Sequence, residues 1–158
     1  MTARIIDGKK IASKIHDEVK VGVRDFESKY GSLPGLAVVL VGDDPASHSY
    51  VKGKEAACAK VGIMTETIRR KASITQTELL ETLGRLNSDP KFSGILVQLP
   101  LPKHLDEDAV IAALDPAKDV DGLHPFNAGN LVLGNNSLRP CTPSGIIEIL
   151  RRENISTK

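Results

Sequence analysis

The feature that most constrains the fold is an unbroken apolar run at residues 36–41, LAVVLV. A strand with one face in water alternates apolar and polar side chains, whereas this run has no polar position. Such runs are typical of strands that are covered on both faces. The run GILV at residues 94–97 has the same character. The sequence therefore predicts a buried sheet that lies between layers of helices.

Segments with helical periodicity separate these runs. Residues 9–30 carry apolar side chains three or four positions apart, which predicts an amphipathic helix. Asp44 is suited to cap the next helix and Pro45 to occupy its first position, while Gly62 is suited to end it. The sequence therefore predicts a central helix close to residues 47–61.

Thr75 and Glu78 have the spacing of a capping box, which opens a further helix. The remaining expected elements are strands at 4–6 and 63–70, a short helix at 105–114, a small hairpin at 131–138, and a last helix at 144–152 that Thr142 caps and Pro143 starts. Strands and helices then alternate four times, which implies βαβ units with right-handed crossovers. We therefore predict an α/β fold, a three-layer αβα arrangement with a mostly parallel sheet.

In such sheets a ligand binds beyond the carboxyl ends of the strands. Polar stretches at 42–49 and 98–102 directly follow two expected strands, and a third at 119–122 lies in the loop region. The predicted binding region therefore combines residues from these three stretches.

Composition narrows the function without identifying it. The chain has 158 residues, enough for one domain, and its net charge of +1 gives no argument for nucleic acid or a membrane as partner. Its start has no long apolar run, so we expect no signal peptide or transmembrane span. Cys58 and Cys141 form no CxxC motif, which favours a reducing, cytoplasmic compartment. The four histidines lack metal-ligand spacing, so we predict no metal site.

Lys54 has an unusual position on the central helix. On a helical wheel, one arc holds, in order, Ala57, Tyr50, Val61, Lys54, Ser47, Cys58 and Val51. Lys54 therefore lies in the middle of the apolar face. A buried ammonium is costly unless it finds a partner or loses its proton. Two interpretations remain open at this point, a lysine that extends to the rim of the helix and a functional amine.

Gln98 and Asp121 are ambiguous when each is considered alone. Gln98 ends an apolar strand and precedes a proline-stiffened loop, so its amide either serves a ligand or satisfies a backbone group. Asp121 precedes Gly122 and is either a turn residue or a ligand-binding carboxylate. The chain contains no G-x-G-x-x-G and no P-loop motif. The Tyr50-x-x-x-Lys54 spacing also occurs in short-chain dehydrogenases, but those enzymes carry a glycine-rich loop that is missing here.

Four motifs in a fixed order carry a specific resemblance. They are SHSYVKGKEAACAKVGI, GILVQLPLPKHL, KDVDGLHPFNAGNL and RPCTPSGIIEIL. The chain resembles the bifunctional methylenetetrahydrofolate dehydrogenase/methenyltetrahydrofolate cyclohydrolase family along its whole length. The resemblance matches the amino-terminal half of the family's usual chain and implies that the second, Rossmann-type NADP domain is absent. It implies a folate-binding catalytic domain at 1–148 and the start of a linker at 149–158.

The resemblance also implies roles for individual residues. Lys54 corresponds to the lysine proposed to move protons, and Tyr50 to the aromatic ring that packs on the folate. Gln98 corresponds to the amide that binds the lysine, and Asp121 to the carboxylate that holds the pterin. These four are the expected catalytic residues. The expected substrate contacts also include Ser47, Val51, Lys52, Gly53, Val97 and Leu99. No cofactor-binding residue is expected within this chain.

The function implied by the resemblance lies in one-carbon metabolism and purine biosynthesis. Methylenetetrahydrofolate gives a hydride to NADP, and the resulting methenyl cation is hydrolysed to formyltetrahydrofolate. A neutral amine near that cation can exchange protons without repelling it. The implied whole enzyme is a homodimer, and this chain alone is expected to lack dehydrogenase activity. Two alternatives stay open, a folate-binding module without turnover and an α/β interaction domain in which Lys54 only extends to the rim.

Overall fold

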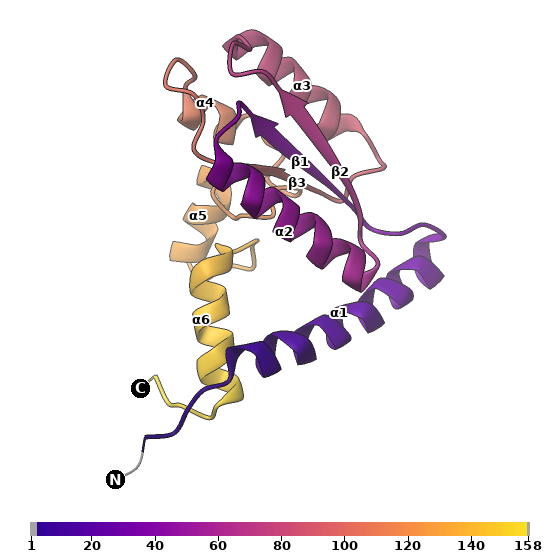
Figure 1. Cartoon of the computed structure of the whole chain (residues 1–158), viewed down its shortest axis with the longest axis vertical. Helices are drawn as coiled ribbons and strands as arrows, with labels where there is room; N and C mark the ends of the chain where they lie inside the picture. The colour runs from indigo at the N-terminus through magenta and orange to yellow at the C-terminus, as the bar shows by residue number, and fades with distance from the viewer. Residues whose placement is uncertain (1–2, 158) are drawn as a thin grey trace.

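The computed structural model describes residues 3–157, and a parallel sheet forms its centre (Figure 1). Within these residues the sheet has three strands in the order β2–β1–β3. The elements are α1 Gly8–Tyr30, β1 Gly35–Val41, α2 Pro45–Val61, β2 Met64–Arg70, α3 Gln76–Ser88, β3 Gly94–Val97, α4 Glu107–Ala112, α5 Pro125–Val132 and α6 Cys141–Arg152. The predicted three-layer α/β arrangement is confirmed.

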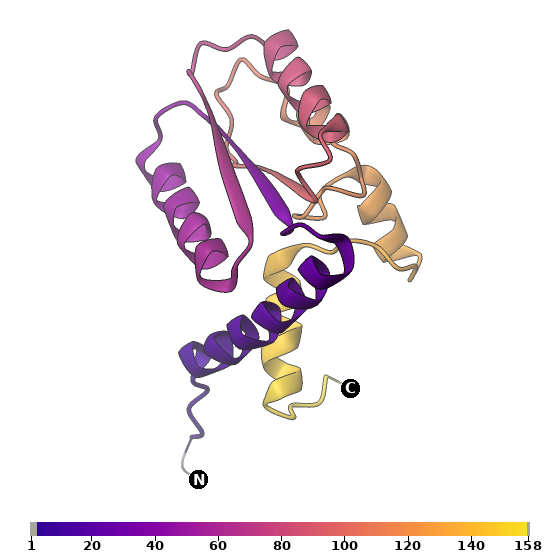
Figure 2. The same ribbon diagram turned by 90° about the vertical axis from the view of Figure 1, so that its right-hand side faces the viewer.

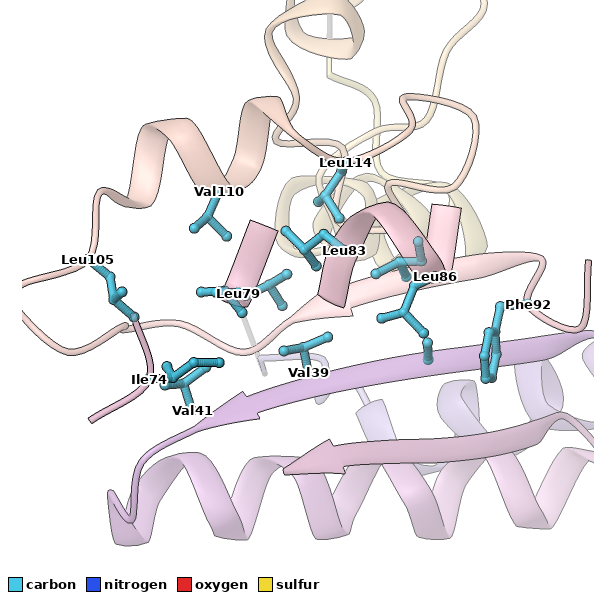
Figure 3. Close-up of a cluster of buried hydrophobic side chains, with 13 residues drawn as sticks. Val39, Val41, Ile74, Leu79, Leu83, Leu86, Phe92, Leu105, Val110 and Leu114 are labelled. Atoms are coloured by element: carbon cyan, nitrogen blue, oxygen red, sulfur yellow. The ribbon is translucent and has the colours of Figure 1, made fainter. Parts of the chain in front are cut away.

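Strand β1 is buried on both faces, as its apolar run predicts. Side chains alternate across a strand, so Val38 and Leu40 face one helical layer while Val39 and Val41 face the other. On the first face they pack with Val51 of α2. On the second face they join a larger cluster that includes leucines of α3 and Val110 of α4 (Figure 3). Figure 2 shows the strands between α2 on one side and α3 on the other.

Parallel pairing brings the carboxyl ends of the strands to one edge. Leu36 pairs with Thr65 of β2 and with Gly94 of β3, so all three strands run in the same direction. Beyond that edge, the N–H of Gln98 continues the ladder by donating to the Val39 carbonyl at 2.9 Å. Asp119 forms an isolated parallel bridge with Ile95. The loops that follow β1 and β3 therefore start side by side.

Helices α1 and α6 lie at the end of the molecule opposite α3 and α4, where they approach one another (Figures 1 and 2). Helix α1 also contacts α2, and Val23 of α1 lies under Gly62 at the end of α2. A left-handed Gly31 ends α1, since its N–H donates to the Glu27 carbonyl. The first and last helices of the described chain are thus packed against each other.

Three sequence predictions about elements are wrong. Residues 4–6 form no strand, because no neighbouring strand is available to pair with them, and Ile5 is 89% exposed. The predicted hairpin at 131–138 is instead the end of α5 followed by a loop. Helix α6 begins at Cys141, before the predicted cap Thr142, so Pro143 lies in its first turn, where its missing N–H costs little.

Candidate functional site

Helix α2 carries Lys54, and both ends of this helix are fixed by local interactions. At its start, Asp44 accepts a hydrogen bond from the N–H of Ser47 at 2.7 Å, and Pro45 occupies the first turn. At its end, Gly62 adopts a φ of 89°, and its N–H donates to the Cys58 carbonyl. These caps are readable in the sequence, so the extent of α2 could be predicted closely.

The buried face of α2 agrees with the helical wheel at its centre. The buried residues of this helix are Ser47, Val51, Cys58 and Val61. Lys54 falls within that arc and is half-buried. Tyr50 and Ala57, which the wheel places at one margin of the arc, are exposed instead. The apolar face is therefore narrower than predicted, and Lys54 lies close to one edge of it.

Gln98 is the hydrogen-bond partner of Lys54. The Nζ atom of Lys54 donates to Oε1 of Gln98 at 2.9 Å, although the two residues are 44 positions apart. The Nε2 atom of Gln98 donates to the Leu99 carbonyl at 2.6 Å, which fixes the orientation of the amide. The amide oxygen is therefore directed at the lysine. A packing role for Lys54 alone would not require this second, orienting bond.

Asp121 lies near this pair and is half-buried in the loop between α4 and α5. Burial raises the pKa of its carboxyl, and the negative charge of Asp119 adds to this effect. The positive charge of Lys54 and a hydrogen bond from the Cys141 thiol act in the opposite direction. Lys54, Gln98 and Asp121 thus bring an amine, an amide and a carboxyl group to the carboxyl edge of the sheet.

The other predicted contacts are distributed unevenly around this group. Tyr50 precedes Lys54 by one helical turn and is 67% exposed, which leaves its ring free to meet a ligand. Lys52 and Gly53 are exposed as well. The side chain of Val51, by contrast, packs in the core against the sheet and does not reach the site.

Three further predicted contacts are constrained by the strands and caps. Val97 is buried with its side chain in the cluster on the α3 side of the sheet, so only its backbone lies next to Gln98. Leu99 offers its carbonyl, which Gln98 already uses. Ser47 is buried at the start of α2, and its N–H is bound by Asp44. These residues therefore shape the site mainly through the backbone.

Two residues near Asp121 were not predicted as part of the site. Asp119 is 1% exposed, and the thiol of Cys141 lies 3.5 Å from the Val120 carbonyl. No local pattern distinguished Asp119 from the other turn residues of the stretch 119–122. No local pattern marks Cys141, which reaches Asp121 only through the fold of the chain.

Other candidate sites are less well supported. Within residues 3–157, no group of three His, Cys, Asp or Glu side chains is arranged to hold a metal ion. A cavity of about 370 Å³ lies beside α3, lined by residues that include Arg70, Glu78 and Arg85, but none of the predicted site residues lines it. Among the described residues, no helix has both the length and the apolar character needed to cross a membrane.

Comparison with known sequences identifies a family for most of the chain. Residues 6–121 match the sequence model described as "Tetrahydrofolate dehydrogenase/cyclohydrolase, catalytic domain". The bifunctional protein FolD of Brevibacillus brevis is 55% identical over 152 residues, which are 96% of this chain and 53% of that protein. FolD of Bacillus subtilis is 50% identical over 155 residues, 98% of this chain and 54% of that protein.

Solved structures with the same architecture agree with these matches. The bifunctional enzyme FolD of Campylobacter jejuni has a TM-score of 0.93 and 44% identity, and the match covers 96% of this chain and 54% of that one. FolD of Trypanosoma brucei, solved with NADP cofactor and an inhibitor, has a TM-score of 0.91 and 36% identity over 98% of this chain and 53% of that one. The chain spans about half the length of the curated relatives that it matches.

Proposed function

The chain belongs to the tetrahydrofolate dehydrogenase/cyclohydrolase family, and from this membership we propose that it supplies the folate site of a bifunctional enzyme of one-carbon metabolism. The whole enzyme would oxidise methylenetetrahydrofolate with NADP and hydrolyse the methenyl product to formyltetrahydrofolate. The observation that carries the proposal is the Lys54–Gln98 hydrogen bond of 2.9 Å, with Asp121 within electrostatic range of the same lysine. All three residues fall inside the matched segment 6–121.

The arrangement supports distinct tasks for these three residues. Lys54 would exchange protons with the water that attacks the methenyl carbon and with the opening ring. Gln98 accepts a hydrogen bond from Lys54, so it fixes the direction in which the remaining bonding positions of the amine point. Asp121 would accept hydrogen bonds from the amino-pyrimidine edge of the pterin. Tyr50, exposed one turn before Lys54, would pack on the ring system.

NADP is the proposed cofactor of the whole enzyme, in keeping with the relative solved with NADP. When bound, NADP would accept the hydride from methylenetetrahydrofolate. This chain has no glycine-rich phosphate loop, so its residues do not fit a dinucleotide. We therefore assign no hydride-transfer step to them. The chemistry proposed for this chain is folate binding and proton movement during hydrolysis.

Further proposals follow from family membership. Residues 1–148 would form the folate-binding catalytic domain, and 149–158 would start a linker toward the NADP domain. Helix α6 runs across position 148, so such a linker would begin as a helix. The whole protein would act as a homodimer in the cytoplasm. Sedimentation of a chain that includes both domains tests the dimer, and a monomer would contradict it.

Lys54→Met tests the central assignment, because methionine keeps most of the unbranched side chain but cannot carry a proton. In the full-length enzyme, we expect the rate of methenyltetrahydrofolate hydrolysis to fall about 100-fold or more, the usual contribution of a general acid–base group. Tetrahydrofolate binding, measured by calorimetry, should remain. Lys60→Met, an exposed lysine in the last turn of α2, is the matched control and should behave as the unaltered chain. Normal hydrolysis by Lys54→Met would remove the proposed role.

The unaltered chain separates the alternatives. Tetrahydrofolate binding without hydrolysis above the solvent rate would favour a folate-binding module without turnover. Neither heat nor a thermal shift on adding tetrahydrofolate would favour an interaction domain, because a ligand that binds the native state must stabilise it. We expect no reduction of NADP when methylenetetrahydrofolate is added to the chain. Such reduction would contradict the assignment of hydride transfer to another domain.

A further inference from the structure

Asp119 is a buried carboxylate without a cationic partner. Its residue is 1% exposed, and no ion pair to it is formed within residues 3–157. Its Oδ2 atom accepts hydrogen bonds from the N–H of His124 at 2.8 Å and from Nδ2 of Asn127 at 3.0 Å. A carboxylate is rarely buried unless it is paired or hydrogen-bonded, and these two neutral donors supply the hydrogen bonds to Asp119.

The two bonds join separate parts of the fold. Asn127 lies in α5, and its Nδ2 also donates to the Pro116 carbonyl at 2.9 Å. On the other side of Asp119, the N–H of Ile95 in β3 donates to the Lys118 carbonyl at 2.7 Å. The carboxylate therefore holds the start of α5 against the segment that lies along β3.

The same carboxylate lies next to Asp121. Both aspartates line a small cavity of about 10 Å³, no larger than one water molecule, together with residues of β3. The N–H of Gly122 donates to the Asp119 carbonyl at 3.2 Å, which closes the turn that contains Asp121. Movement of Asp119 would therefore move Asp121 directly.

We propose that Asp119 is a positioning residue, whose buried carboxylate fixes the loop 119–124 between α4 and α5 and so holds Asp121 in range of Lys54. The expected effect of this positioning on substrate binding rests on the proposed folate function. Asp119 does not itself contact the substrate in this proposal. Its effect reaches the site through the position and the charge environment of Asp121.

The charge of Asp119 gives the proposal a second consequence. The groups around Asp121 are Lys54 from α2, Cys141 from α6 and Asp119 from its own loop. Burial is the largest cause that raises the pKa of Asp121, and the charge of Asp119 raises it further, while Lys54 and Cys141 lower it. Removing the Asp119 charge should therefore move the titration of Asp121 to lower pH. A purely mechanical role for Asp119 would not predict this shift while the loop remains in place.

Asp119→Asn is the principal test, because it keeps the size of the side chain and removes its charge. We expect the carboxyl titration of Asp121, followed by ¹³C NMR, to move to lower pH. We expect tetrahydrofolate to bind about tenfold more weakly, as for the loss of one hydrogen bond to a charged group. Asp108→Asn makes the same chemical change at an exposed position of α4 and should alter neither quantity.

Asn127→Ala provides a second, independent measurement. It removes one hydrogen bond to Asp119 but leaves the charge, so it should weaken tetrahydrofolate binding while moving the Asp121 titration less than Asp119→Asn does. If Asp119→Asn does not fold, Asn127→Ala still tests the positioning role of Asp119. Unchanged binding and unchanged amide exchange at His124 in a folded Asn127→Ala chain would overturn the proposal, as would an unchanged Asp121 titration in Asp119→Asn.

The folate function of the chain and the positioning role of Asp119 can be contradicted independently. If the unaltered chain does not bind tetrahydrofolate, the folate function is wrong, but the NMR titration and the amide exchange at His124 still test the positioning role. If the unaltered chain binds tetrahydrofolate and the variants of Asp119 and Asn127 bind it equally well, only the positioning role is wrong.

Discussion

Asp121 is the residue at which binding and stability conflict. Its carboxyl is half-buried beside another carboxylate, and burial is the largest cause that raises its pKa. A raised pKa means that the folded chain holds the proton more tightly than the unfolded chain does. The ionised form that is suited to hold a pterin is therefore the form that the fold tolerates less well. Natural binding sites often retain such costs.

This conflict predicts that Asp121→Asn stabilises the chain at neutral pH. Unfolded, the carboxyl ionises near pH ~3.9; folded, it ionises at higher pH. Between these two values the native state binds more protons, so its stability falls as the pH rises, and the cost persists at pH 7. The variant should unfold at higher urea concentration at pH 7, and the difference should disappear at or below pH ~3.9.

The control for this prediction is Asp108→Asn, which makes the same change in net charge at an exposed site. A lower urea midpoint for Asp121→Asn than for the unaltered chain at pH 7 would contradict the prediction. Tetrahydrofolate binding should weaken in Asp121→Asn alone. Gain of stability and loss of binding in one variant would be the expected combination for a binding carboxylate.

Only part of this site could be predicted from local sequence patterns, for physical reasons. Lys54 was detectable because a helix has a fixed period, so a charge on an apolar face is visible in the order of residues. Its bond to Gln98 was expected only from the family resemblance, since 44 residues separate the two. The burial of Asp119 and the proximity of Cys141 depend on tertiary packing that no local pattern records.

At the scale of elements, the loop after Asp121 must pass very close to the start of α6. Gly122 has a φ of +65°, in the left-handed region that favours glycine. A Cβ atom at this position would lie 2.6 Å from the Arg139 carbonyl carbon and 2.8 Å from the Pro140 nitrogen. Because these are backbone atoms, they cannot move aside without displacing α6. Gly122 therefore couples the candidate site to the last helix.

Gly122→Ala should consequently lower the free energy of unfolding by about 2 kcal/mol or more, the cost of a strained φ together with a backbone clash. It should also weaken tetrahydrofolate binding, because Asp121 would move with the loop. Gly129→Ala is the matched control, since Gly129 lies within α5 and a Cβ there meets no atom within 4 Å. That control should gain about 0.5–1 kcal/mol from better helix propensity. Equal stability of the two variants in urea denaturation would contradict the argument.

Helices and strands that are specified by nearby residues were predicted more accurately than elements that depend on a distant partner. Helices α1 and α2, the start of α3 and strands β1 to β3 were predicted within a residue or two, because caps and apolar periods specify them. The predicted strand at 4–6 failed because pairing depends on a neighbour, and the hairpin at 131–138 failed because a short apolar run does not distinguish helix from strand. The turn residues near α5 did not predict this helix.

For the molecule as a whole, the sheet and its covering helices form one unit, and α1 and α6 form a second packing arrangement beside it (Figure 2). Charged side chains link α1 and α6. Arg152 of α6 donates to both carboxylate oxygens of Glu18 in α1, at 2.8 and 2.5 Å, and to Glu148 of α6 at 2.6 Å. Glu18 and Arg152 are 134 positions apart. Together with the ion pair between Arg4 and Glu153 at 3.0 Å, this bidentate contact joins the two ends of the described chain.

Arg152→Met should therefore destabilise the chain in a salt-dependent way. Methionine retains most of the apolar stem, so the lost interactions are mainly the charge pairs with Glu18 of α1 and Glu148 of α6. We expect a lower urea midpoint than for the unaltered chain at low salt, and a much smaller difference at about 1 M NaCl, where the Debye length is only ~3 Å. Arg151→Met is the control, because Arg151 is 74% exposed and pairs only within α6. An equal loss for Arg152→Met at both salt concentrations would show that packing of the stem, and not the ion pair, joins α1 to α6.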